Sequence, residues 1–462
     1  MTSIRLQGRR LGKRVAGACA ALLLPLLACS DANDRLLGVT DPDIINPTDI
    51  VNADGAIALG NGAIATFRSI TGGGESTWLF GGLLADEWST SSTFIQNDET
   101  DQRFIQEFNS SVTGMLRDLY RVRTRTNEAI ASLREYSPNS TALIGEMYLA
   151  RGFAEMQLAL DFCNGIPINN LGSPEPSNET PKTNQQVFQY AAASLDSAIA
   201  TATGTDATSV QVNRAARVAR GRVALALGAF TEAAGFVTGI PSSFAYQHTF
   251  SLTTSNNTIW GQGLSARRYS VGDSVEGNAR NIRVTNALPF ASAGDPRLPV
   301  TIRTSGAING QDGQTYARTT TMWQQLTPVD VANGIDARMI EAEVALRAGN
   351  VTQWLGIHNA LRAAPPKLGE IQPAAMPALV DPGSEAARVS LHFREKAFWT
   401  FSRGQRLGDM RRLIRQYGRT EATVFPQGVH YKGGNYGTDV NLPVVQAERN
   451  NPNFTGCIDR NP

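Results

Sequence analysis

The chain has 462 residues and a formal net charge of +1, with 42% hydrophobic and 18% charged residues. This length predicts one large domain or two fused domains, with ample chain for a buried core. The sequence shows no concentrated basic face of the kind that nucleic-acid binding requires, so that class of function is excluded.

The first 28 residues have the layout of a secretory signal peptide. A leader with five Lys or Arg and no acid precedes a short apolar run at 15–28. That run is shorter than the roughly 20 apolar residues that a membrane-spanning helix needs. It ends in LLAC, which resembles a bacterial lipobox, so we expect cleavage before Cys29 and lipidation of this cysteine. The alternative is an ordinary signal cut nearby, with Cys29 lost or left as a plain thiol.

The mature chain would then begin at Cys29 and carry a small negative charge. Loss of the leader leaves 37 of the 42 basic residues against 41 acidic ones, a net charge of −4. No second apolar run reaches spanning length, which predicts a protein anchored to a membrane rather than threaded through it. Residues 29–50 are rich in Asp, Asn and Pro. They predict an extended tether ahead of a domain at 51–462.

In an exported chain, only two of the four cysteines remain available to form a disulfide. Cleavage would remove Cys19 and lipidation would use Cys29, which leaves Cys163 and Cys457. Disulfides persist in oxidising compartments, so we hypothesise a bridge between these two residues. The alternative is that both are buried free thiols.

Apolar residues spaced three and four positions apart predict amphipathic helices along most of the domain. The first helix is predicted to start near Val51 and to stop at the glycine-rich break TGGGES. The polar sequence that follows predicts a long, ordered loop within 71–103.

A pair of long helices is predicted next. The first starts at Ser110, and the second follows the SPNS turn, where Ser137 and Asn139 are candidate caps. The second helix is expected to end at Asn164-Gly165, because glycine favours the residue just past a helix end.

Three further helical pairs and one loop-rich insertion complete the domain. The pairs are predicted at 183–202 with 213–237, at 336–350 with 354–364, and at 385–404 with 405–418. Short turns and many Ala and Gly residues make these pairs similar to tetratricopeptide-type hairpins. The insertion at about 240–330 is rich in Ser, Thr, Gly and Asn, with short strands predicted in 300–306 and 315–323. Loops on a rigid scaffold are the usual place for function.

Signs of catalysis or metal binding are weak. The four His residues have no metal-ligand spacing, and no CxxC, GxSxG or P-loop motif is present. The densest acidic clusters are Asp86-Glu87 and residues 98–101. Neighbours in sequence on one loop seldom face each other across a substrate, so we interpret these clusters as helix caps and solvated loop charges. The sequence therefore favours recognition over catalysis, with no metal and no cofactor.

The C-terminal stretch EKAFWTFSRGQRLGDMRR, Glu395 to Arg412, carries the most specific motif. It resembles the pattern E-R-A-F-E-L-F-x-E-G-x-R-L-x-D-L-R-R of the SusD/RagB family, and VFPQG and ERNNPN follow it as in that family. The matching positions are Glu395, Ala397, Phe398, Gly404, Arg406, Asp409, Arg411 and Arg412. ARMIEAEVALRAGN, MYLARGFAEMQLALDFCNGIPI and DPRLP also resemble family segments, so the resemblance covers nearly the whole mature chain.

Members of this family are outer-membrane lipoproteins that bind nutrients, most often glycans, for a TonB-dependent SusC-type transporter. The resemblance implies a mainly α fold, in which a tetratricopeptide-like helical hairpin scaffold carries a loop-rich insertion with short strands. It also implies a single such domain at 51–462, on a lipid-anchored protein of the outer membrane that faces the exterior and is not an enzyme.

The family motif is interpreted as architecture rather than as a binding site. Its residues Arg406, Asp409 and Arg412 are spaced three apart on a helix, so opposite charges should be neighbours there. The departures from the pattern are Lys396, Trp399 and Arg403, which replace Arg, Glu and Glu. The fold should survive these changes, but the local ion pairs must be rewired.

The ligand-binding residues are predicted from chemistry, because no motif identifies the ligand. Sugar rings have apolar faces that stack on flat aromatic side chains, whereas Asn, Asp, Gln and Arg bind the hydroxyl groups. Aromatic residues in the expected loops are Trp78, Trp88, Trp260, Tyr269 and Trp323. For any single one, a place in the core or against a transporter is an open alternative.

Two function classes remain open from the sequence, with a third less supported. The first is a lipid-anchored protein that captures a glycan or similar nutrient for a SusC-type transporter. The second is a helical-repeat lipoprotein that scaffolds an envelope assembly and binds no small ligand. A secreted hydrolase is the weaker third.

Overall fold

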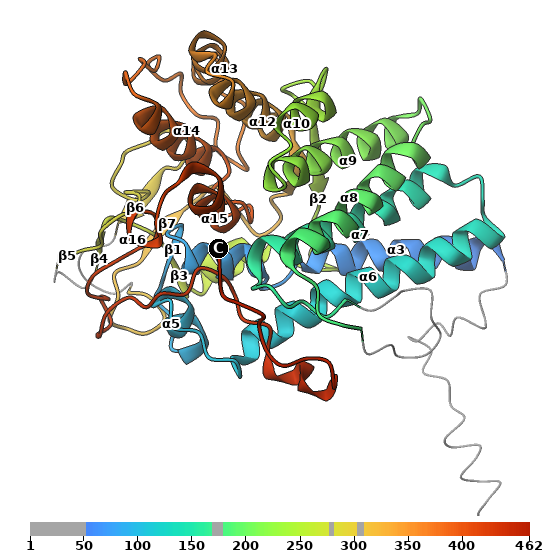
Figure 1. The fold of residues 1–462 in the computed structure, drawn as a ribbon, viewed down its shortest axis with the longest axis horizontal. Coiled ribbons are helices and arrows are strands. Elements are labelled where there is room, and N and C mark those ends of the chain that lie inside the picture. Colours follow the sequence, from blue (N-terminus) through green and yellow to red (C-terminus); the bar gives the residue numbers. More distant parts are fainter. Residues whose placement is uncertain (1–51, 169–178, 277–280, 303–308) are drawn as a thin grey trace, which may run out of the picture. The chain divides into compact units, whose positions relative to one another are not determined.

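The computed structural model describes residues 52–168, 179–276, 281–302 and 309–462. The predicted signal peptide, the lipidation site Cys29 and the tether lie outside the described residues. Residues Asn52–Pro462 cluster as one unit, and this unit is mainly helical (Figure 1).

Most helices follow the predicted pairs. In chain order the helices are α3 (Ala53–Ser69), α4 (Thr77–Leu84), α5 (Ile95–Asp101), α6 (Ser110–Tyr136), α7 (Thr141–Asp161), α8 (Asn184–Thr201), α9 (Ala207–Ala226), α10 (Phe230–Val237), α11 (Thr258–Trp260), α12 (Gly334–Arg347), α13 (Val351–Ala363), α14 (Glu385–Trp399), α15 (Arg406–Tyr417) and α16 (Glu421–Val424), with a π-turn η2 (Gly261–Ser265) and a 3-10 turn η3 (Gln446–Asn450). The helix predicted at 213–237 is divided into two, α9 and α10, and the long loop predicted within 71–103 contains α4 and α5.

The strands are short and mostly lie in the insertion. They are β1 (Trp88–Thr90), β2 (Ala245–His248), β3 (Tyr269–Val271), β4 (Val275–Glu276), β5 (Ile282–Arg283), β6 (Val300–Ile302), β7 (Arg318–Thr320) and β8 (Val329–Asn333).

The helices stack in sequence order, which confirms the predicted hairpin scaffold. Helix α7 packs against α6 on one side and α8 on the other, and α8 packs against α9 and α9 against α10. Glycines allow the closest approach, as the composition predicted. A Cβ atom added at Gly145 would lie 2.8 Å from the Cβ of Ala202, and one at Gly152 would lie 2.7 Å from Cγ of Leu195. Side chains there would push α7 and α8 apart.

Two predicted boundaries of α7 are wrong. Neither Ser137 nor Asn139 caps its start: Ser137 is the last cap of α6, and Ser140 stands at the N-cap position of α7. The helix ends at Asp161, before the predicted Asn164-Gly165. Its next residue, Phe162, is already extended and forms a bridge with Leu442, because the chain pairs there with the C-terminal segment.

The strands form antiparallel pairs that join distant parts of the chain. The two strands predicted in the insertion are confirmed as β6 and β7, which pair with each other. Strand β1 pairs with β3, so Trp88 lies opposite Val271 and Thr90 opposite Tyr269. This pairing brings the loop segment before α6 against the insertion, as Figure 1 shows for β1 and β3. The two segments in which the sequence predicted a ligand site are therefore neighbours.

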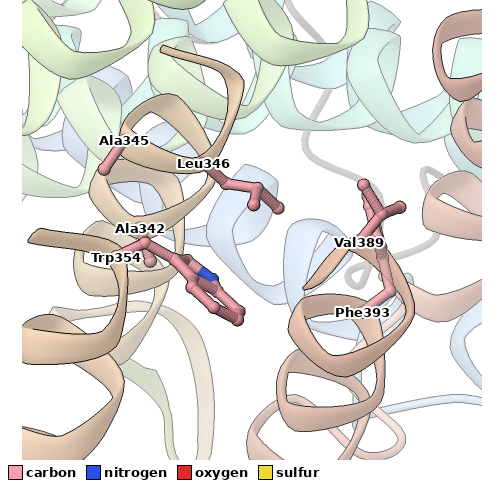
Figure 2. Packing of buried hydrophobic residues seen from close by; sticks show 6 residues of the cluster. All are labelled: Ala342, Ala345, Leu346, Trp354, Val389 and Phe393. Atoms are coloured by element: carbon pink, nitrogen blue, oxygen red, sulfur yellow. The ribbon is translucent and has the colours of Figure 1, made fainter. Parts of the chain in front are cut away.

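A separate hydrophobic cluster joins α12, α13 and α14. Figure 2 shows Trp354 and Leu346 on one side of it, facing Val389 and Phe393 of α14. Trp354 is fully buried. Burial of one such large side chain contributes about 2–3 kcal/mol, so this cluster fixes the late helical pairs as a rigid body.

The hypothesised disulfide is present between Cys163 and Cys457. Cys163 follows α7 and is fully buried. The bridge ties the C-terminal tail to the middle of the helical scaffold, 294 residues away in sequence.

Candidate ligand-binding site

Four of the five predicted aromatic residues are core residues. Trp78 and Tyr269 are fully buried, and Trp88 and Trp323 are 2% and 5% exposed. Trp78 is also not in a loop, because it lies on α4. Only Trp260, at the end of α11, keeps a partly exposed side chain. Their expected placement as loop residues that face a ligand is thus corrected for all but Trp260.

The buried rings form a floor beneath the loops. Trp88 packs against Tyr269 and Phe401, with ring centroids 6.2 and 5.1 Å away, and its indole N–H donates to Ser402 Oγ at 3.0 Å. Trp323 stacks on the same Phe401 at 6.1 Å. Apolar neighbours from the C-terminal helices therefore account for these aromatics.

Asp86, Glu87 and Asp101 are buried, which corrects the interpretation of these three as solvated charges, whereas Asp98 and Glu99 stay partly exposed. Asp86 accepts two hydrogen bonds from Arg406, at 2.7 and 2.9 Å. Glu87 is 1% exposed and accepts the backbone N–H of Ser402 at 2.8 Å. Burial raises the pKa of Glu87 to about 8, and the charge of Asp86 adds to the rise. Asp101 accepts from the backbone N–H of Thr90 at 2.7 Å.

The family motif forms a buried charge network. Only one of the two expected i, i+3 pairs is made, between Arg412 and Asp409 at 3.4 Å. Asp409 pairs more closely with Lys396, at 2.7 Å. Arg406 instead reaches Asp86 at 2.7 Å, on the segment before β1. The motif therefore binds α15 to the region below the loops.

Buried ion pairs hold both Arg403, which departs from the family pattern, and Glu395, which matches it. Arg403 makes two hydrogen bonds to Asp336, at 3.0 and 2.7 Å. Glu395 pairs with Arg297 of the DPRLP segment at 2.8 Å, and Arg297 also pairs with Asp295 at 2.7 Å. Such pairs fix position well, because breaking one partner leaves an uncompensated buried charge.

An exposed aromatic with polar neighbours lies above this floor. Phe94, just before α5, is 44% exposed, and the Arg268 guanidinium lies 4.6 Å from its ring centroid. Arg268 also donates to Gln262 Oε1 at 3.4 Å. Gln311 holds the chain beside Phe94, as its Oε1 accepts from Ser92 Oγ at 3.2 Å. We call Phe94, Gln262, Arg268 and Gln311 the Phe94 platform.

The loop that carries Phe94 is held in place from several sides. The backbone N–H of Phe94 donates to Ser92 Oγ at 3.1 Å. Lys432 donates to the Ser92 carbonyl at 2.7 Å and pairs with Asp98 at 2.8 Å and Asp312 at 3.2 Å. Burial alone would raise the pKa of Asp312, but hydrogen bonds from Thr315 and the charge of Lys432 lower it. The platform thus has fixed supports.

The backbone beside the platform is strained. Arg267 has a φ of +54°, a region that non-glycine residues seldom adopt. Its carbonyl accepts from Ser91 Oγ at 2.7 Å and from the Gln311 N–H at 3.0 Å. Its Nε donates to the Asn309 carbonyl at 3.0 Å. Such strain persists only where the surroundings hold it, and it is common at binding sites.

Sequence reasoning missed Phe94, although it named the segment. The available signal was a lone aromatic inside the polar run STSSTFIQNDETD. An apolar ring in such a run has few local partners, so it is either covered by a distant segment or left exposed. The platform offers a flat apolar face, a guanidinium and amide groups, which together suit a polyhydroxylated ring.

Among the described residues, neither a metal-binding cluster nor a membrane-spanning helix is present. Within the described ranges, no group of three or more His, Cys, Asp or Glu side chains is placed to hold a metal ion. In the same part of the chain, every helix is too short or too polar to span a bilayer.

Comparison with known proteins gives structural matches alone. No family model and no curated sequence matches the chain. A SusD superfamily protein from Bacteroides fragilis matches with a TM-score of 0.65 and 16% identity, over 88% of this chain and 99% of that one. A SusD-like protein from the same species matches with a TM-score of 0.62 and 12% identity, over 90% and 99%.

A third structure, a SusD-like carbohydrate binding protein from Bacteroides vulgatus, matches with a TM-score of 0.58 and 13% identity, over 78% of this chain and 83% of that one. The identities are low, but the three alignments cover 78–90% of this chain. The chain therefore has the fold of the SusD superfamily.

Proposed function

We propose that this protein is a SusD/RagB family member that captures a glycan at its surface and delivers it to a TonB-dependent SusC-type transporter. It acts by binding and not by catalysis. The observation that carries the proposal is the Phe94 platform, an exposed ring beside the Arg268 guanidinium on a loop with fixed supports. The description of one protein of this fold as carbohydrate binding supports the ligand class.

The platform suits a shallow, reversible site. A protein that passes its ligand on must hold it without burying it, and a surface of one or two rings does so. We expect dissociation constants in the micromolar to millimolar range, about −4 to −8 kcal/mol. Trp260, partly exposed two residues before Gln262, is a further candidate contact.

The partner surface is proposed beside the platform. Phe104 and Phe108, between α5 and α6, are 64% and 68% exposed. Large apolar side chains in one exposed segment commonly mark a protein interface. We propose that this segment contacts the transporter. Co-purification of the two proteins from the native envelope tests this contact. A Phe104→Ser/Phe108→Ser variant should lose the transporter while the Phe94→Ala variant keeps it.

The membrane location rests on the LLAC sequence at Cys29. A lipidated Cys29 would hold the protein on the outer membrane, facing the exterior. Cys29→Ser should move the protein from the membrane to the soluble fraction. Continued fractionation of this variant with the outer membrane, in the absence of detergent, would rule out the lipid anchor.

The direct test of ligand capture is a glycan array probed with the full chain. We expect saturable binding to a family of related oligosaccharides. If no glycan binds while the transporter still co-purifies, the scaffold alternative replaces the proposal. The Phe94→Ala variant serves as the matched control on the same array.

A further inference from the structure

A second cavity shares no residue with the Phe94 platform. It lies between the N-terminal end of α8, the C-terminal end of α9 and helix α15, and its volume is about 450 Å³. This is within the range of small-molecule sites. The residues used below, all of which line it, are Asn164, Gln185, Phe188, Leu227, Arg415 and Gln416.

The walls of this cleft are formed by side chains that already have hydrogen-bond partners within the protein. Asn164 accepts the backbone N–H of Asn184 at 2.7 Å and donates to Asp459 at 2.9 Å. Gln416 donates to the Leu225 carbonyl at 2.9 Å, at the end of α9. Phe188 is 1% exposed and forms an apolar base. The shape of the cleft is therefore fixed by contacts that a ligand need not make.

The free groups in the cleft are mostly donors, and the buried Oδ1 of Asn184 is an acceptor that also has no partner among the described residues. The side chains of Gln185 and Arg415 make no hydrogen bond to any described residue, and both are exposed. The backbone N–H of Gln185, in the first turn of α8, also lacks a partner within the described part of the chain. Its neighbours are satisfied, Asn184 by Asn164 and Gln186 by Thr183.

The charges near the cleft are mixed, because the carboxylates of Asp161 and Asp459 lie close enough to act on Arg411. Among the described residues that line it, Arg415 is the single charged side chain. Arg411, one turn earlier on α15, is 1% exposed, and its Nε and Nη2 atoms have no acceptor among the described residues. Although part of the Arg415 side chain meets solvent, the protein atoms packed around its guanidinium and then the charge of Arg412 lower its pKa to about 10. Burial and then Arg415 itself lower the pKa of Arg411 to about 9.

We propose that this cleft binds the anionic group, a carboxylate or a phosphate, of a small polar molecule. Arg415 supplies a charged donor pair, and Gln185 supplies its amide and its backbone N–H. Phe188 and Leu227 cover the apolar side of the ligand. The site is independent of glycan capture at the Phe94 platform.

Isothermal titration of the full chain with four probes tests this assignment. The probes are glucuronate, glucose 6-phosphate, inorganic phosphate and glucose as the neutral control. We expect saturable binding of at least one of the two anionic sugars, about tenfold or more tighter than glucose. The glucuronate and phosphate arms separate the two sources of the anion.

Variants then locate the binding. Arg415→Gln should weaken binding of the anionic probe about tenfold. Leu227→Trp should fill the cleft and abolish binding. Arg117→Gln, an exposed arginine on α6, is the matched control and should bind as the parent does. Phe94→Ala should also leave anion binding unchanged. Absence of saturable binding for every anionic probe, or equal binding by Arg415→Gln, would overturn the proposal.

Discussion

Trp88 connects strand β1 to the turn between α14 and α15. Its ring lies between Tyr269 of β3 and Phe401 beyond α14, and its N–H donates to Ser402. Gly404 lies in the same region and has a φ of +64°. A Cβ atom added there would lie 2.2 Å from the Trp78 ring, so only glycine fits. Single residues far apart in sequence thus hold β1, the strand that precedes Phe94, in place.

Trp88→Ala should therefore destabilise the fold. Loss of a buried Trp side chain and its hydrogen bond costs about 3–5 kcal/mol. Phe104→Ala, an exposed aromatic in the same part of the chain, is the control and should change stability by less than about 0.5 kcal/mol. Urea unfolding followed by fluorescence compares the two. Equal midpoints for Trp88→Ala and the parent would show that this indole is not packed as described.

Glu87 should make the protein less stable as the pH rises from about 4.5 to about 8. Its folded-state pKa is raised from 4.5 to about 8 by burial, so in this window the folded state keeps a proton that the unfolded state releases. The contribution of this group to stability is complete below pH 4.5 and falls by at most about 1.4 kcal/mol per pH unit.

Glu87→Gln removes this titration and keeps an acceptor for the Ser402 N–H. Unfolding curves at pH 5, 6.5 and 8 should show the parent losing stability relative to the variant as pH rises. Asp161, whose pKa burial raises to about 7, contributes equally to both proteins and cancels in the difference. A constant difference across the three pH values would contradict the assignment.

At the scale of elements, the α14–α15 pair positions the site without touching it. Arg406 of α15 holds Asp86 before β1, and Arg403 holds Asp336 of α12. Glu395 of α14 holds Arg297 in the insertion. The family motif is therefore a set of anchors, which explains why it is recognisable in sequence while the loops above it carry no motif.

The Cys163–Cys457 bridge anchors the tail in the same way. It closes a loop of nearly 300 residues, and the chain-entropy model gives about 5–6 kcal/mol for such a closure. The Cys163→Ala/Cys457→Ala variant should lose stability up to this amount. Dithiothreitol should destabilise the parent and leave the variant unchanged. Peptide mapping without reductant that finds both thiols free to alkylate would contradict the bridge.

The helical elements could be predicted from the sequence because their signals are local. Apolar spacing located α6 and α7, and Thr183 begins the α8 segment as its capping residue, with Gln186 completing the box. The burial of Trp88 and Trp323 could not be predicted, because their shared partner Phe401 is distant in sequence. The exposure of Phe94 could not be predicted either, because it depends on which distant segments of the fold leave the ring uncovered.

At the scale of the whole molecule, a rigid scaffold presents two adjoining loop segments. Helices α6 to α9 pack pair by pair, and β1 joins β3 to bring the segments together. The Phe94 platform lies on this junction. Its supports, Lys432 and Gln311, come from the tail side and from the insertion.

The central claim is that Phe94 contacts the captured glycan. Isothermal titration with the strongest glycan from the array, alongside thermal melts, tests it most directly. Phe94→Ala should weaken binding about tenfold, equivalent to ~1.4 kcal/mol, with a nearly unchanged melting temperature. Phe104→Ala, which removes another exposed phenylalanine outside the platform, should bind the glycan as the parent does. Parent-like affinity for Phe94→Ala would contradict the claim and place the glycan elsewhere on the molecule.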